Sequence, residues 1–196
     1  MNKPFSQSCE NNKQPILQRI QTVFQQSQTV WEIGSGTGQH ACYFAENLPH
    51  LTWQATDRAE NIAGIDSWID HATLANLPKS LALNVADQQW PCQHIDALFT
   101  ANTLHIMHID EVGCFFNGLK NYLTDKAKVC IYGPFNYQGQ YTSQSNQQFD
   151  QWLKARDPAS GIRDFEAIER LANNAGIFIN NDFAMPANNR LLVFQK

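Results

Sequence analysis

The chain has 196 residues, of which 43% are hydrophobic, and its 14 basic and 18 acidic side chains give a formal net charge of −4. This length and hydrophobic content predict a single domain, 1–196, with one substantial core and no Pro- or Ser-rich linker. Because the balance is weakly acidic and no run of Lys and Arg occurs, a nucleic-acid partner is disfavoured and a small molecule is favoured.

The five cysteines, at positions 9, 42, 92, 114 and 130, form no C-x-x-C pair. Reduced thiols are therefore favoured, and no metal site is expected. The first ten residues lack the apolar core of a signal peptide, and no stretch is long enough to span a bilayer. We expect a soluble, cytoplasmic protein without a membrane partner, while the sequence leaves the oligomeric state open.

Hydrophobic spacing predicts alternating helices and strands. Pro15 suits the first position of a helix, because it has no N–H to leave unsatisfied there. Ser145 and Gln148 fit a capping box that opens a short helix within a long insertion. The last helix is closed by Gly176. The predicted strands are 28–33, 51–57, 80–85, 97–101 and 128–132, and the other predicted helices are 40–47, 62–69, 112–123 and 165–172.

The tail departs from this alternation. Residues 177–183 and 191–194 are two strand-like runs, and the seven or so residues between them are too few for a helical crossover. The two runs are therefore predicted to pair as an antiparallel hairpin.

Residues 31–40, Trp-Glu-Ile-Gly-Ser-Gly-Thr-Gly-Gln-His, join the first strand to a helix. Such turns are where α/β sheets bind ligands. Glycine suits the turn because it adopts positive φ and lets a ligand approach the main chain. The dinucleotide fingerprint G-x-G-x-x-G needs its third glycine where this chain has Gln39, so a dinucleotide is disfavoured. A glycine-rich connector without a ligand is the alternative.

An acidic residue two positions before the first glycine gives Glu-x-Gly-x-Gly-x-Gly, which resembles the first motif of class I S-adenosylmethionine-dependent methyltransferases. The resemblance implies a Rossmann-like α/β fold, with a seven-stranded, mostly parallel sheet, a C-terminal antiparallel hairpin and helices on both faces. It also implies S-adenosylmethionine as the cofactor, with the loop around its methionine and ribose parts. The loop residues that it assigns to the cofactor are Glu32, Gly34, Ser35, Gly36 and Gly38.

The same layout places further cofactor contacts after the second and third strands. Asp57 resembles the family's acidic residue that accepts hydrogen bonds from both ribose hydroxyls, or else it caps the next turn. Arg58 lies beside the adenine or is solvated. Where the family usually has Asp and a small residue, this chain has Asn84-Val85. The adenine contact therefore comes from Asn84 and Val85, or it moves to Asp87.

The fourth strand ends at Ala101 and Asn102, and His105 follows in the next loop. Strand ends at this edge face the ligand crevice, so we assign Ala101 and Asn102 to the cofactor and place Asn102 and His105 near the transferred methyl group. His105 is the candidate general base, because the pKa of imidazole is near neutral; a histidine tied into the loop is the alternative. His40 opens the helix after the glycine loop, where it borders the cofactor or only caps the helix.

The insertion 133–164 combines aromatic side chains with Asn, Arg and Asp, a mixture that suits a substrate pocket. We interpret it as a substrate lid; a surface excursion that extends the core is the alternative. Asn136 and Tyr137 are candidate substrate contacts. Arg156 and Arg163 suit a substrate carboxylate or phosphate, unless the neighbouring aspartates pair with them.

Several motifs together narrow the resemblance. They are Ala-Asn-Thr-Leu-His-Ile, Tyr-Gly-Pro-Phe-Asn-Tyr, Gly-Ile-Arg-Asp-Phe-Glu and Met-Pro-Ala-Asn-Asn. With the glycine loop, they look like a family of methyltransferase-like proteins catalogued as a domain of unknown function, over nearly the whole chain. In related folds an N-terminal segment covers the cofactor, which adds Glu10, Asn12 and Lys13 as candidates; a frayed arm is the alternative.

The leading hypothesis is S-adenosylmethionine-dependent methyl transfer to a small polar or anionic molecule. The protein must then align the acceptor atom behind the methyl carbon and exclude water. One alternative is a cofactor-binding protein without catalysis, such as a sensor or partner subunit. Another is a dinucleotide-dependent oxidoreductase, and methylation of a macromolecule is the least favoured. The acceptor atom and the pathway are left open.

Overall fold

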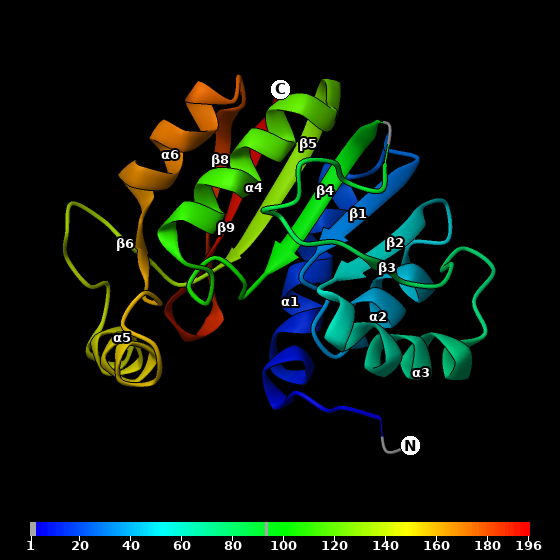
Figure 1. Cartoon of the computed structure of the whole chain (residues 1–196), viewed down its shortest axis with the longest axis horizontal. Helices are drawn as coiled ribbons and strands as arrows, with labels where there is room; N and C mark the ends of the chain where they lie inside the picture. Colours follow the sequence, from blue (N-terminus) through cyan, green and yellow to red (C-terminus); the bar gives the residue numbers. More distant parts are fainter. Residues whose placement is uncertain (1–2, 93) are drawn as a thin grey trace.

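The computed structural model describes residues 3–92 and 94–196. Seven strands form one sheet in the order β3-β2-β1-β4-β5-β9-β8 (Figure 1). The parallel strands are β1 (Thr29–Ile33), β2 (Thr52–Asp57), β3 (Leu81–Ala82), β4 (Ile95–Ala101) and β5 (Leu123–Gly133). β8 (Phe178–Met185) and β9 (Asn189–Gln195) form an antiparallel hairpin, and β9 also pairs antiparallel with β5. The predicted parallel sheet with a terminal hairpin is confirmed.

Helices cover both faces of the sheet (Figure 1). On one face, α1 (Gln7–Val23), α2 (Gln39–Asn47) and α3 (Ile62–Ala72) bury apolar side chains in a cluster that includes Ile16, Phe44 and Ile65. On the other face, α4 (Ile109–Tyr122) and α6 (Phe165–Asn174) contribute to a second cluster, which includes Phe115 and Ile168. Burial of such side chains on both faces stabilises the layers by roughly 1.5–3 kcal/mol for each large aliphatic or aromatic group.

The order of the strands reverses at β1, which has β2 on one side and β4 on the other. In open α/β sheets, ligands bind beyond the carboxyl ends of the strands at such a switch point. The segments that leave β1 and β4 there are the glycine loop 34–38 and the loop 102–108. The topology therefore brings together the two segments that the sequence analysis selected for cofactor and acceptor.

The insertion after β5 contains β6 (Phe135–Asn136), α5 (Gln144–Arg156) and β7 (Arg163–Asp164). β6 and β7 pair in parallel as a separate two-stranded sheet, which the sequence analysis did not predict. In Figure 1 the insertion lies on the side of the main sheet toward which β4 and β5 point. The short helices η1 (Ala59–Asn61) and η2 (Pro186–Asn188) follow β2 and β8.

Three local predictions were wrong. The first helix does not begin at Pro15; it begins after Ser6, whose side chain accepts a hydrogen bond from the Cys9 amide (3.4 Å), and Pro15 lies inside it. The lost Pro15 N–H is outweighed by the packing of this helix against the sheet. The insertion helix is capped by Ser143, which accepts from the Asn146 amide (3.1 Å), and not by Ser145. The third strand is only two residues long.

Candidate active site

The glycine loop is shaped by three residues with positive φ, at 75° for Gly34, 58° for Gly36 and 85° for Gly38. A Cβ on Gly34 would lie 2.7 Å from Thr103 Cγ2, and one on Gly38 would lie 3.2 Å from Ile65 Cα. Gly36 is exposed, and a Cβ there would meet no atom within 4 Å. Gly34 and Gly38 therefore allow neighbouring parts of the chain to pack closely against the loop. At Gly36, in contrast, there is open space in front of the loop.

Asp57 lies against this open part of the loop. Its Oδ2 accepts a hydrogen bond from the Gly36 amide (2.6 Å), and its Oδ1 accepts from the Arg58 amide (2.7 Å) and from Asn61 Nδ2 (2.9 Å). A carboxylate offers about four lone-pair sites, so the group retains capacity for a ligand hydroxyl. The Arg58 guanidinium pairs with Glu111 at the start of α4.

Glu32 supports the loop from the interior. It is 1% exposed and accepts a hydrogen bond from Trp53 Nε1 (2.8 Å). Burial raises the pKa of its carboxyl to about 7, opposed by the hydrogen bonds from Trp53 and Ser35. The Glu32 carbonyl also accepts from the Thr56 hydroxyl (2.7 Å), which joins β1 to β2 just below the glycines.

Gln39 occupies the position of the missing third glycine, and its side chain is buried. Its Oε1 accepts a hydrogen bond from the Ser6 amide (2.6 Å), and its Nε2 donates to Glu10 Oε1 (2.6 Å). Glu10 also pairs with Lys13. The first turn of α1 is thereby attached to the start of α2, beside the glycine loop. The spacing of the glycines shows only that residue 39 differs from a dinucleotide-binding site, and it gives no sign of these hydrogen bonds.

His40 lies in the interface between α1 and α2. Its Nε2 is 2.6 Å from Asn12 Oδ1, and its ring stacks on Phe44. Burial lowers the pKa of His40 to about 4, so the ring is neutral at physiological pH. Both its hydrogen-bond partner and its stacking partner belong to the helices.

Asn84 and Val85 follow the short strand β3. Asn84 Oδ1 accepts from the Ala86 amide (3.0 Å), and the Asn84 amide donates to Asp87 Oδ2 (3.4 Å). Val85 is buried in the cluster on the α4 side of the sheet. Asn84 and the exposed Asp87 therefore belong to one turn, and the sequence alternatives for the adenine contact lie side by side.

His105 lies beyond the end of β4, close to the candidate residue Asn102 and to Gly133. A Cβ on Gly133, at the end of β5, would lie 3.8 Å from His105 Nδ1 and 3.9 Å from Asn102 Oδ1. Asn102 has a φ of 58°, while Ala101 is the last residue of β4. The other side of the imidazole faces Phe149 of α5, with ring centroids 5.2 Å apart. Burial and the charge of Arg163 lower the pKa of His105 to about 4.

The four candidate substrate contacts of the insertion have different surroundings. Asn136 is buried, and its Oδ1 lacks a hydrogen-bond partner among the described residues. The Tyr137 hydroxyl donates to Asp182 (2.7 Å), and the exposed Arg156 guanidinium lies over the Trp152 ring. Arg163 donates to main-chain carbonyls and is not paired with its neighbouring aspartate. The sequence alternative that Asp164 holds Arg163 is therefore wrong.

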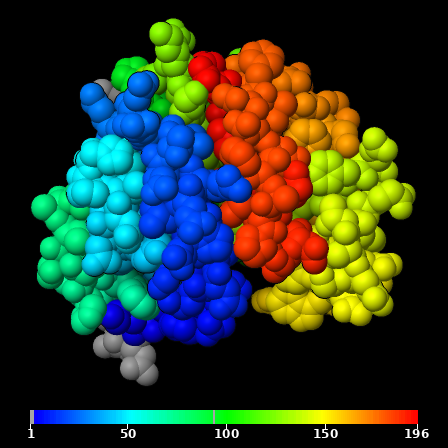
Figure 2. Space-filling model, turned by 180° about the vertical axis from the view of Figure 1, so that it is seen from behind, coloured from blue at the N-terminus to red at the C-terminus, as the bar shows by residue number. Residues whose placement is uncertain are grey.

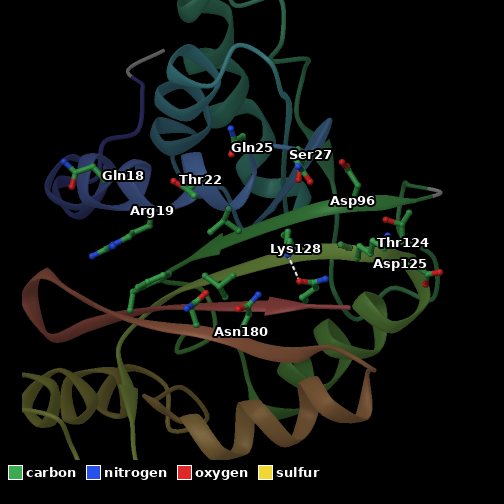
Figure 3. Close-up of a pocket in the computed structure, with 18 residues that line it drawn as sticks. Gln18, Arg19, Thr22, Gln25, Ser27, Asp96, Thr124, Asp125, Lys128 and Asn180 are labelled. Atoms are coloured by element: carbon green, nitrogen blue, oxygen red, sulfur yellow. Dashed lines mark hydrogen bonds between the residues drawn. The ribbon is translucent and has the colours of Figure 1, made fainter.

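A separate cavity lies between the second half of α1 and the β8–β9 hairpin. From behind, Figure 2 shows a hollow between the blue α1 and the orange-to-red hairpin. Its volume is about 750 Å³, and Arg19 and Asn180 are among the residues that line it (Figure 3). Lys128 in its floor donates to Gln195. The candidate site residues named above do not line it.

In residues 3–92 and 94–196, no group of three or more His, Cys, Asp or Glu side chains is placed to hold a metal ion. No helix in these ranges is long and apolar enough to cross a membrane.

The fold defined by this sheet and its switch point is the Rossmann-like class I methyltransferase fold. An O-methyltransferase family protein from Burkholderia thailandensis is similar, with a TM-score of 0.82 and 16% identity over 94% of this chain and 56% of that chain. The S-adenosylmethionine-dependent methyltransferase SibL has a TM-score of 0.81 and 17% identity, over 96% of this chain and 55% of that chain. CalO1, a methyltransferase in calicheamicin biosynthesis in its SAH-bound form, has a TM-score of 0.70 and 16% identity, over 85% of this chain and 48% of that chain.

This chain thus spans about half the length of those solved proteins. Residues 3–196 match the family model described as "Protein of unknown function (DUF938)", and the chain belongs to that family.

Proposed function

We propose that the protein is an S-adenosylmethionine-dependent methyltransferase that acts on a small polar molecule. The observation that carries the proposal is the contact between Gly34 and Thr103. It puts the loop that would hold the cofactor directly beside the loop that bears His105. A methyltransferase needs these two functions to be adjacent, because the acceptor atom must approach the methyl carbon in line.

The residues of the glycine loop fit the cofactor. Gly36 combines a positive φ with open space where a side chain would project, which is the form of a cradle for a ligand. Asp57 lies at the same place and offers a carboxylate to the ribose hydroxyls. When bound, the cofactor supplies an electrophilic methyl group. The chain's own residues bind it, orient the acceptor and exclude water.

The acceptor side is assigned to the strand ends around His105 and to the insertion 133–164 as a lid. A hydroxyl acceptor loses its proton as it takes the methyl group, whereas an ammonium acceptor must lose a proton first to free its lone pair. The neutral His105 imidazole has a lone pair to receive either proton. Asn136 Oδ1 is buried and has no hydrogen-bond partner within residues 3–92 and 94–196, so it can accept a hydrogen bond from an N–H or O–H of the substrate. An anionic acceptor has less support, because the Arg163 guanidinium already binds carbonyls.

Isothermal titration with S-adenosylmethionine and S-adenosylhomocysteine tests the first half of the proposal. We expect binding of both, and no binding at millimolar concentration would overturn it. Incubation with S-adenosylmethionine and fractionated small metabolites then tests transfer, with S-adenosylhomocysteine as the measured product. Binding without product from any fraction would indicate a non-catalytic cofactor-binding protein. Tighter binding of NADH than of either S-adenosyl compound would indicate an oxidoreductase.

A further inference from the structure

The loop that carries His105 is held from outside by one short segment of the insertion. Four consecutive carbonyls of the loop, at residues 104, 105, 106 and 107, each accept a hydrogen bond from residues 160–163. The His105 carbonyl accepts from the Gly161 amide (2.9 Å), and the Ile106 carbonyl accepts from the Ser160 hydroxyl (2.9 Å). We call residues 160–163 the clamp.

Arg163 provides the two outer bonds of the clamp. Its Nε donates to the Leu104 carbonyl (3.1 Å), and its Nη2 donates to the carbonyls of Met107 and Ala159, the latter at 3.0 Å. The planar guanidinium therefore spans the loop from one side of His105 to the other. Only arginine offers several donors in a fixed fork, so lysine cannot reproduce this arrangement.

The clamp is itself anchored in the insertion through Asp150, which is 1% exposed. Asp150 Oδ1 accepts from the Ile162 amide (2.7 Å), and its Oδ2 accepts from the Tyr141 hydroxyl (2.7 Å) and Lys154 Nζ (2.6 Å). A Cβ on Gly161 would lie 2.9 Å from Asp150 Oδ1, so the clamp approaches α5 as closely as glycine allows. The anchor is rigid because a buried carboxylate with three partners has few alternatives.

We propose that Arg163 is a positioning residue for methyl transfer: by fixing the carbonyls on both sides of His105, it holds the imidazole beside Asn102 and Gly133, and it does not bind the acceptor. The role of Arg163 in catalysis rests on the proposed function, whereas the effect of Arg163 on the position of the His105 ring does not. A hydrogen bond from a charged donor is stronger than one between neutral groups, so loss of the fork should open the loop at least about tenfold more often.

The experiment compares Arg163→Met, which removes charge and donors, with Arg163→Lys, which keeps the charge and loses the fork. Arg156→Met, in the same insertion, is the matched control, because Arg156 lies exposed over Trp152. Two properties of His105 are measured: the rate of acylation by diethyl pyrocarbonate, resolved by mass spectrometry, and the ring pKa by NMR. His40 is a second buried histidine and serves as internal reference.

We expect Arg163→Met to raise the acylation rate of His105 about tenfold and to raise the pKa of its ring, while His40 stays protected. Arg163→Lys should raise the rate but leave the pKa low, because the positive charge remains. Arg156→Met should change neither. The proposal is overturned if His105 stays as protected in both Arg163 variants as in the wild type, or if His40 and His105 become reactive together.

If Arg163→Met does not fold, Ser160→Ala removes a single bond of the clamp, to the Ile106 carbonyl, and should give a smaller rise in the same rate. An unchanged rate in that folded variant and in Arg163→Lys also overturns the proposal. Titration with S-adenosylhomocysteine is run on every variant. Failure of the wild type to bind it would overturn the proposed function, while the two His105 measurements would still decide the role of Arg163.

Discussion

Gly34 and Thr103 are in contact across the switch point between β1 and β4, at a distance that excludes any side chain on residue 34. Gly34 is the first residue of the glycine loop after β1. Thr103 begins the turn that leads to His105, and its hydroxyl donates to the Ala101 carbonyl (3.0 Å). The glycine loop 34–38 and the loop 102–108 are therefore packed directly against each other. A displacement of either loop should shift the other, because close-packed interiors transmit strain.

The open space at Gly36 gives the first prediction. Gly36→Ala should weaken binding of S-adenosylhomocysteine at least about tenfold and cost about 1–2 kcal/mol of stability, because a Cβ enters the cradle in the left-handed region. Gly139→Ala is the matched control: Gly139 has a φ of 71° and equally open surroundings, but it lies in the insertion. Titration calorimetry and urea unfolding are the measurements. Equal binding by the two variants would show that the loop does not hold the ligand.

The alternation of strands and helices could be predicted because it depends on local hydrophobic spacing. The terminal hairpin could be predicted because the segment that connects its two strands, ending before residue 191, is too short for a helical crossover. The glycine loop could be placed between a strand and a helix because both of these elements are recognised from local hydrophobic spacing. The clamp could not, since residues 104–107 and 160–163 are more than 50 positions apart and meet through main-chain carbonyls that carry no sequence signal. The role of Gln39 could not be predicted, because its partners are Ser6, which caps α1, and Glu10 in the first turn of α1, whereas the predicted helix begins only at Pro15.

Glu32 gives a prediction about pH. Burial raises the pKa of its carboxyl to about 7, above the ordinary value of 4.5, so its contribution to stability is fully present below about pH 4.5 and is lost as the pH rises through 7. The loss approaches about 3 kcal/mol. Glu32→Gln should remove this loss, because a neutral amide oxygen still accepts from Trp53. Urea unfolding at pH 5 and pH 8 measures the difference, with the exposed Glu60→Gln as control. A wild type and a Glu32→Gln variant with the same pH dependence would contradict the prediction.

His105 should show the opposite pH dependence. Burial and the charge of Arg163 lower its pKa to about 4, below the ordinary 6.5, so its contribution is present above about pH 6.5 and is lost as the pH falls through 4. His105→Gln should reduce the loss of unfolding free energy between these two pH values by up to about 3 kcal/mol. The exposed His71→Gln variant should retain the wild-type loss.

The same variant tests the catalytic assignment. His105→Gln should bind S-adenosylhomocysteine as the wild type does, since the glycine loop and Asp57 are unchanged. With any hydroxyl or ammonium acceptor, transfer should fall about a hundredfold or more, because the variant lacks the imidazole that is proposed to take the proton. Single-turnover formation of S-adenosylhomocysteine is the measurement, and transfer at the wild-type rate would remove His105 from the mechanism.

Gln39→Gly separates the two explanations of the glycine loop. The substitution completes the G-x-G-x-x-G spacing of dinucleotide-binding proteins, yet it also removes the hydrogen bonds that attach Ser6 and Glu10 to α2. If the loop serves S-adenosylmethionine and α1 covers it, the variant should bind S-adenosylhomocysteine about tenfold more weakly and should not acquire affinity for NADH. Gln39→Glu, which keeps the acceptor for the Ser6 amide and repels Glu10, should show an intermediate loss. Because the sheet and the remaining glycines are the same in all three proteins, a gain of NADH binding by Gln39→Gly would mean that spacing alone selects the ligand. Unchanged affinity in both variants would mean that the first turn of α1 has no part in holding it.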